Sequence, residues 1–115
     1  MLVRIVSKIF HRKFRQPLEY YIFDGQKKEI KEFAGLYREI LKNLYKLDGN
    51  LFLNELKYKV SIKTDPDEYG KMSYDKLDEI YYFGTNFSNA EKLDKAKYAL
   101  EIFGLEDDLM IKYAG

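Results

Sequence analysis

Basic side chains near the N-terminus carry the most evident chemistry of this chain. Residues 1–16 contain no acidic residue but several basic ones, Arg4, Lys8, Arg12, Lys13 and Arg15. Because the formal net charge of the whole chain is only +1, the remaining residues are net acidic. A basic segment of this kind is suited to bind phosphate groups or an acidic partner. The alternative is a terminal helix that packs on the core and turns its charged face to solvent.

A second group of lysines follows an alternating pattern. In the stretch KYKVSIK, apolar and polar residues alternate, and lysine occupies the polar positions 57, 59 and 63. This period predicts a half-buried strand with a basic outer face. Such a face can follow a phosphate backbone. The alternative is an edge strand whose lysines discourage aggregation.

A polar turn precedes the last predicted helix and offers a third candidate site. Thr85, Asn86 and Ser88 stand where the free amides and the positive dipole end of a helix are expected. These residues are therefore candidates for binding an anion. The same residues are also those of an ordinary cap, since Ser88 and Glu91 form the S-x-x-E capping box.

Residues for catalysis are sparse. His11 is the only histidine and has no nearby acid in the sequence to orient it. No serine lies in a nucleophile-elbow pattern, and no glycine-rich phosphate-binding motif is present. Asp65, Asp67 and Glu68 lack the spacing of a calcium loop. The sequence therefore favours a non-enzymatic protein, without settling the point, and we predict no catalytic residue, no metal site and no cofactor.

The composition predicts one folded domain. The chain has 115 residues, 46% of them hydrophobic, which argues against disorder. It has no cysteine, so neither a disulfide framework nor a thiolate site can form. No apolar run approaches the roughly 18 residues that a membrane-spanning helix requires. The start of the sequence lacks the pattern of a signal peptide. We therefore predict a cytoplasmic protein with no membrane partner.

The periodicity predicts two main helices. The apolar stripe of residues 31–47 and the capped segment 88–103, followed by Gly104, mark them. Asp24-Gly25 after an aromatic run predicts a β-hairpin over residues 18–30, although a helix starting near Lys27 is an alternative. For residues 1–16 we prefer a basic amphipathic helix ended by Pro17 over a strand. The remaining predictions are a helical stub at 51–56, a loop at 65–72, one helical turn within 73–79, and strands at 57–63, 80–83 and 108–113.

These elements predict the α+β class, with a small antiparallel or mixed sheet packed against two helices. Residues 1–17 would form an arm or terminal helix and residues 18–115 a single α+β domain. Three segments, residues 22–41, 81–90 and 100–113, resemble a small α+β module of uncharacterised prokaryotic proteins, often attached to larger restriction or defence-type proteins. The resemblance covers residues 18–114. It implies the fold but carries over no catalytic residue.

Two functional hypotheses follow. The first is a nucleic-acid-binding module or small accessory protein that contacts the DNA or RNA backbone through the arm and the lysine-rich strand: Arg4, Lys8, Arg12, Lys13, Arg15, Lys57, Lys59 and Lys63. The second is a protein–protein interaction module, such as a subunit, adaptor or inhibitor, with a homodimer as one form. It would dock through exposed tyrosines: Tyr20, Tyr69, Tyr74 and Tyr113. The first hypothesis requires the two basic groups to lie on one face of the molecule.

Overall fold

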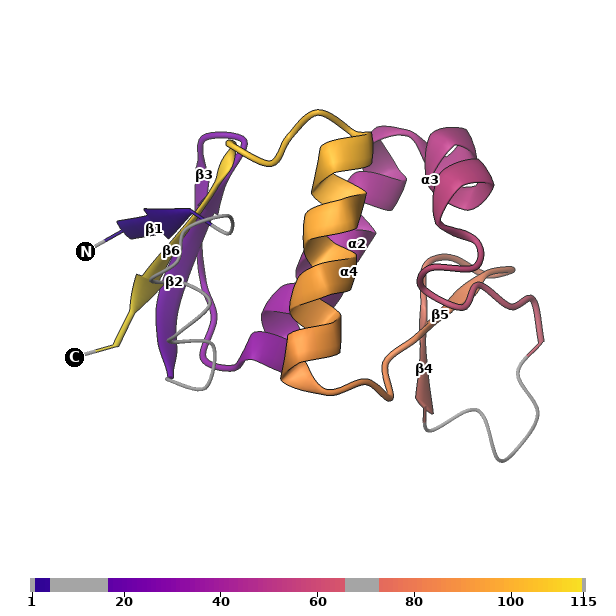
Figure 1. The fold of residues 1–115 in the computed structure, drawn as a ribbon, viewed down its shortest axis with the longest axis horizontal. Helices are drawn as coiled ribbons and strands as arrows, with labels where there is room; N and C mark the ends of the chain where they lie inside the picture. Colours follow the sequence, from indigo (N-terminus) through magenta and orange to yellow (C-terminus); the bar gives the residue numbers. More distant parts are fainter. Residues whose placement is uncertain (1, 5–16, 66–72, 115) are drawn as a thin grey trace.

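The computed structural model describes residues 2–4, 17–65 and 73–114, and these form three layers (Figure 1). A four-stranded sheet forms one outer layer, and a pair of long helices forms the middle layer. A short helix and a two-stranded sheet form the other outer layer. Both chain ends lie on the side of the four-stranded sheet (Figure 1).

The four-stranded sheet is antiparallel, in the order β1-β6-β2-β3. Its strands are β1 (Leu2–Arg4), β2 (Leu18–Phe23), β3 (Gln26–Glu29) and β6 (Leu109–Tyr113). Asp24 and Gly25 join β2 to β3 with φ of 53° and 77°, the left-handed pair that a type I′ hairpin turn requires. Opposed residues such as Tyr21 and Ile111 are buried toward the helices.

The middle layer consists of α2 (Phe33–Leu47) and α4 (Asn89–Ile102), which lie side by side along one face of the sheet (Figure 1). The apolar stripe of α2 is buried, as its period predicts, with Leu36, Leu41 and Leu44 fully inaccessible. On α4, Ala96 and Ala99 are also inaccessible, and their small side chains allow a close approach between the helices. Burial of this continuous apolar surface is the main term that stabilises the fold.

The third layer contains α3 (Gly49–Leu56), β4 (Tyr74–Lys76) and β5 (Tyr82–Gly84). It is joined to α2 by polar contacts as well as by packing. The buried Tyr37 hydroxyl donates to the Gly84 carbonyl at 3.2 Å, and the Tyr45 hydroxyl donates to the Asp78 carboxylate. The Lys42 ammonium of α2 forms an ion pair with the Asp75 carboxylate of β4, with 3.0 Å between nitrogen and oxygen. One face of α2 therefore packs against the four-stranded sheet, and another contacts the third layer.

The α+β class, the two long helices and the hairpin are confirmed. The capping box of α4 is also confirmed, with both hydrogen bonds between Ser88 and Glu91 at 3.2 Å. Gly104, with a φ of 69°, forms the predicted left-handed end. The helical stub after α2 is α3.

Three predictions of local structure are wrong. Leu2–Arg4 form a strand instead of the preferred helix, because they pair with β6. The remainder of the predicted N-terminal helix, residues 5–16, lies outside the described residues, so the division at residue 17 stays a prediction. Residues 57–61 form turns instead of a strand. Tyr74–Lys76 form β4 where a helical turn was expected, because they pair with β5.

Candidate functional site

The lysine turn, residues 57–63, follows α3 directly and is the best-defined of the predicted basic sites. The Val60 amide donates to the Leu56 carbonyl at 3.1 Å, and the Ile62 amide donates to the Lys57 carbonyl at 2.9 Å. Val60 is fully buried, and its carbonyl accepts the Gly84 amide of β5 at 2.8 Å. The turn is therefore attached to the core by its own backbone.

Tyr58 is the most exposed of the large hydrophobic residues that the structure describes, at 88%. The lysine turn points this ring away from the core, although the predicted strand would have buried it. The Lys57 ammonium lies 5.7 Å from the centre of the ring. Lys57 forms no ion pair with any described residue. An aromatic face and a cation are thus presented together to solvent.

Lys59, in contrast, is engaged with α4. Its ammonium lies 2.8 Å from the Asp94 carboxylate and 5.0 Å from the centre of the Tyr98 ring. The hydrogen bond from Lys59 lowers the pKa of Asp94. The Lys95 ammonium donates to the Lys59 carbonyl at 2.7 Å. We conclude that Lys59 holds the turn against α4, while Lys57 faces outward.

Lys63 lies at the end of the turn and pairs with β5. Its backbone exchanges two hydrogen bonds with Tyr82, at 2.9 and 2.8 Å. Its ammonium lies 5.2 Å from the centre of the Tyr74 ring. The backbone pairing fixes where this exposed lysine emerges.

A groove of about 780 Å³ separates α3 from residues 62–65. Lys57 and Lys63 line it, together with two amide side chains of α3, Asn50 and Asn54. The two asparagines are four positions apart and share one face of the helix. Ammonium groups can bind phosphate oxygens, and amides can donate to and accept from the edges of bases. Asp65 also lines the groove, and its carboxylate would repel a phosphate placed next to it. The groove therefore offers ammonium groups at Lys57 and Lys63 and amides at Asn50 and Asn54, but it is not uniformly basic.

The basic arm is not brought to the lysine turn by the residues that the structure describes. Arg4 lies in β1, in the outer layer opposite α3 and β5 (Figure 1). Its guanidinium lies 3.7 Å from the Asp107 carboxylate, and both side chains are more than half exposed. The other predicted contacts lie outside the described residues: Lys8, Arg12, Lys13 and Arg15.

The turn before α4 serves first as a helix cap. The Ser88 hydroxyl accepts the Glu91 amide, and the Glu91 carboxylate accepts the Ser88 amide. The hydrogen bond from the Ser88 backbone is the main cause that lowers the pKa of Glu91. Thr85 is buried and Asn86 is exposed. The Glu91 carboxylate already accepts the Ser88 amide and would repel an anion bound at this turn. Anion binding by Thr85, Asn86 and Ser88 stays a prediction.

The tyrosines of the second hypothesis are mostly covered. Tyr113 is buried, at 5% exposure, which contradicts the expectation that it is exposed. It lies on the inner face of β6, where the sheet packs against the helices. Tyr20 and Tyr74 are half-buried under Lys27 and Lys63. Tyr69 lies outside the described residues. Among the described tyrosines, the exposed rings are those of Tyr58 and Tyr98, which the alternating pattern and the helical period did not single out.

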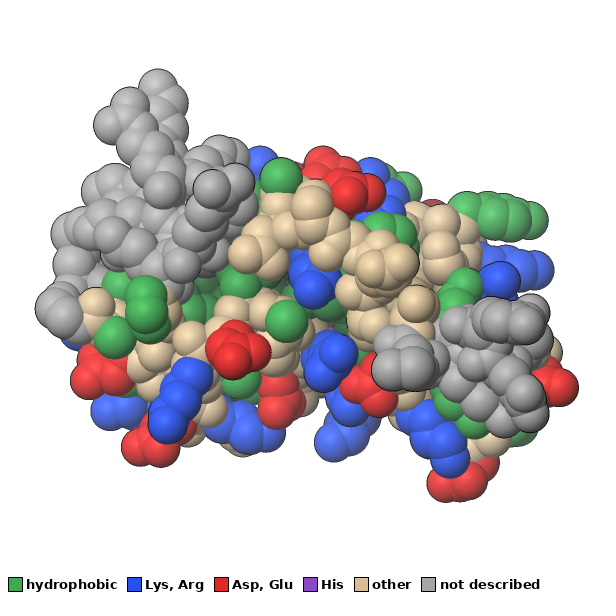
Figure 2. Space-filling view, turned by 90° about the horizontal axis from the view of Figure 1, so that it is seen from below, with side chains coloured by type: hydrophobic (Ala, Val, Ile, Leu, Met, Phe, Trp, Pro, Cys, Tyr) green, Lys and Arg blue, Asp and Glu red, His purple; other side chains and the backbone are tan. Residues whose placement is uncertain are grey.

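Charge on the face shown in Figure 2 is mixed. Basic and acidic side chains alternate along it and do not gather into one field of a single sign. Within the described ranges, no group of three or more histidine, aspartate or glutamate side chains could hold a metal ion. No described helix has the length and apolar character needed to cross a bilayer.

Comparisons with protein-family models, curated proteins and solved structures give no match. The resemblance of residues 18–114 to a prokaryotic α+β module accordingly stays a prediction.

Proposed function

We propose that this protein is a non-enzymatic module that binds single-stranded nucleic acid, DNA or RNA, at the lysine turn. The observation that carries the proposal is the 88% exposure of Tyr58 on a turn whose backbone is attached to the core, beside Lys57. A ring in this position adds nothing to the packing of the core. It offers a flat surface on which a base can stack, with an ammonium close enough to reach the adjoining phosphate.

Single strands suit this surface better than duplexes. The bases of a single strand are accessible for stacking, which contributes roughly 1–3 kcal/mol per base. A duplex presents mainly phosphates to the lysine turn, and two exposed lysines neutralise few of them. The formal net charge of the whole chain is only +1, which favours local contacts over a long electrostatic track. We expect little sequence preference, since phosphate contacts and stacking carry little base information.

The described part of the arm does not meet the requirement that both basic groups lie on one face, so the proposal does not depend on the arm. Arg4 lies in the opposite outer layer, so a strand that covers both Arg4 and Lys57 would have to pass around the molecule. The lysine turn is accordingly proposed to act on its own. Contacts by Lys8, Arg12, Lys13 and Arg15 stay a prediction.

Fluorescence anisotropy with labelled single-stranded and duplex oligonucleotides tests the proposal. Raising the salt concentration from about 50 to about 200 mM should weaken single-strand binding roughly 10-fold, as expected for two or three phosphate contacts. Lys57→Gln should lower the salt dependence by about one phosphate contact. Tyr58→Leu should weaken binding about 5-fold or more, and Tyr58→Phe should retain it.

The matched control is Lys31→Gln, which removes an exposed lysine from the loop before α2. Absence of binding at the lower salt concentration would refute the proposal. An equal loss in Lys31→Gln and Lys57→Gln would also refute it, because binding would then follow total charge. Replacing the four arm residues by glutamine measures the contribution of the arm separately.

A second candidate function is docking to a protein, and the same exposed ring favours it. Tyrosine is enriched in protein interfaces because it combines a large apolar area with a polar tip. Light scattering would detect a homodimer, and Tyr58→Leu should dissociate it into monomers. If the protein binds no oligonucleotide and forms a dimer that Tyr58→Leu disrupts, this candidate replaces the first.

A further inference from the structure

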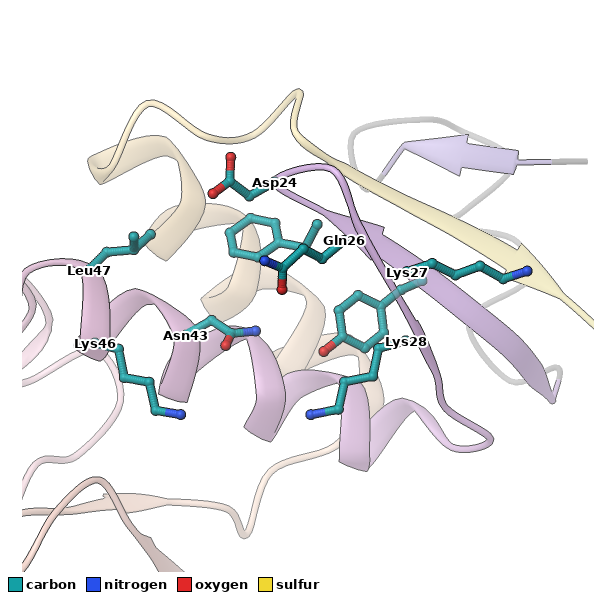
Figure 3. A pocket seen from close by; sticks show the side chains of 9 residues that line it. Asp24, Gln26, Lys27, Lys28, Asn43, Lys46 and Leu47 are labelled. Carbon is teal, nitrogen blue, oxygen red and sulfur yellow. The ribbon is translucent and has the colours of Figure 1, made fainter.

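A cavity of about 260 Å³ lies between the β2–β3 hairpin and the second half of α2 (Figure 3). It lies on the sheet side of α2, and the lysine turn belongs to the opposite outer layer. Its volume suits a small molecule and is too small for a folded partner. The cavity therefore raises a question separate from nucleic-acid binding.

The inner wall of the cavity is apolar. Tyr21 and Phe23 of β2 contribute ring surface and are only 2% and 6% exposed. Leu47 at the end of α2 lies at the rim and is 54% exposed. An exposed leucine beside a buried phenylalanine offers apolar surface that a ligand could cover.

Donor groups converge at one side of the cavity. Lys28 of β3 and Lys46 of α2 point toward one another, with the Asn43 amide between them (Figure 3). Lys46 is exposed and makes no ion pair with the described residues. The Lys28 ammonium lies 3.2 Å from the Glu39 carboxylate, which holds this lysine beside the cavity.

The Tyr21 hydroxyl adds a further donor. Burial, followed by the charge of Glu39, raises the pKa of this phenol, while Lys28 and a hydrogen bond with Asn43 oppose the change. A phenol is protonated at neutral pH with or without this shift, so its hydroxyl can donate to an anion. Two ammonium groups, an amide and a phenol match the several acceptor oxygens of a phosphate better than the two oxygens of a carboxylate.

We propose that this cavity binds a small phosphate monoester with a compact apolar body. Lys46 and Asn43 bind the phosphate, and Phe23 and Leu47 contact the apolar body. Lys28 contributes less than Lys46, because the Glu39 carboxylate already partners it. Lys27 lines the cavity through its backbone side and points its ammonium away, toward the ring of Tyr20 at 4.1 Å (Figure 3). The Asp24 carboxylate lies on the side opposite the two ammonium groups, where it would repel a second anionic group (Figure 3).

NMR titration of the full chain with phenyl phosphate tests this proposal, with inorganic phosphate and benzoate as comparison probes at constant ionic strength. Phenyl phosphate should shift the Asn43 side-chain amide and the backbone amides of Gln26 and Lys28. It should bind more tightly than inorganic phosphate, because of the apolar wall, and more tightly than benzoate. Lys46→Gln should weaken it about 10-fold, the loss expected for one charge-assisted hydrogen bond.

Lys31→Gln is again the matched control and should leave the affinity unchanged. Shifts spread over lysines on all faces, or equal losses in Lys46→Gln and Lys31→Gln, would overturn the proposal. So would the absence of shifts at about 10 mM phenyl phosphate, a concentration that detects even weak ligands. Benzoate binding as tightly as phenyl phosphate would overturn the assignment of a phosphate group. None of these outcomes bears on the proposed function, which rests on Lys57 and Tyr58.

Discussion

Lysine and tyrosine lie together on both sides of α2, but the surfaces that they form differ. On the sheet side, Tyr21 is buried and Lys28 and Lys46 border a concave cavity. On the far side, the ring of Tyr58 is almost fully exposed, and Lys57 beside it also lines the groove next to α3. The same kinds of side chain thus carry two different proposals, a small anion at the cavity and a nucleic-acid strand at the lysine turn. The two proposals therefore differ because the lysines stand in surroundings of different shape.

The backbone explains the difference in shape. On the sheet side, β3 pairs with β2 along its whole length and leaves a gap next to α2 that no side chain fills. On the far side, the chain leaves α3 through tight turns that bury Val60, which forces the neighbouring Tyr58 outward. Four predictions, in order of decreasing effect, test how independent the two sides are.

Tyr37 should be the strongest link between α2 and the far side. Its ring is fully buried, 6.1 Å from the Phe83 ring in an edge arrangement, and its hydroxyl donates to Gly84. Tyr37→Ala should lower the free energy of unfolding by about 3–5 kcal/mol, the range for a large buried aromatic residue. Tyr37→Phe should cost about 1 kcal/mol, the value of one hydrogen bond. Urea denaturation measures both, and equal losses in the two variants would show that the ring volume contributes nothing.

The two ends of α4 should respond separately, because one end lies next to β5 and the other leads into β6. Gly104→Ala should cost about 1–2 kcal/mol through its left-handed backbone, since no atom lies within 4 Å of the added carbon. Ser88→Ala should cost about 1 kcal/mol through loss of the cap. Thermal denaturation of the single and double variants should give additive changes. A strongly non-additive result would show that the two ends are coupled.

Alkaline pH should destabilise the attachment of the third layer to α2 by ionising Tyr45. The hydrogen bond to Asp78 is the main cause that raises the pKa of Tyr45 from 10.0 to about 12. The unfolded phenol ionises first, so this contribution to stability is present below about pH 10 and is lost as the pH rises to about 12. Solvent at this partly exposed site reduces the effect. Denaturant titrations at about pH 9 and 11 should show a smaller loss for Tyr45→Phe than for the unchanged protein. Parallel losses would refute the assignment.

The Lys59–Asp94 pair should contribute least to stability. Asp94 is 71% exposed at its side chain, so a double-mutant cycle with Lys59→Gln and Asp94→Asn should give a coupling of about 0.2–1 kcal/mol. Lys59→Gln should also reduce oligonucleotide binding less than Lys57→Gln, because Lys59 already has a carboxylate partner. A larger effect of Lys59→Gln on binding would place the proposed contact on the α4 side of the turn.

Local patterns accounted for much of the fold. The hairpin at Asp24-Gly25, the stripe of α2 and the capping box of α4 were predictable, because each depends on residues within a few positions of one another. Pairing between strands that lie far apart in the chain could not be predicted from local patterns. The helix prediction for Leu2–Arg4 is wrong because their partner strand, β6, lies at the other end of the chain, where local patterns give no sign of it. The short β4 was missed for the same reason, since its pairing with β5 supplies the evidence for a strand.

The candidate sites show the same division. Composition and spacing by themselves determined that Lys57, Lys59 and Lys63 lie close together and that Ser88 caps a helix. Only the tertiary structure decided that Val60 is buried under β5, so that residues 57–61 turn instead of extending and Tyr58 faces solvent. It also decided that Lys28 and Lys46 meet at one cavity. An alternating pattern fits a strand or a turn equally well until a partner element selects which side chains are buried, and that selection depends on residues far away in the chain.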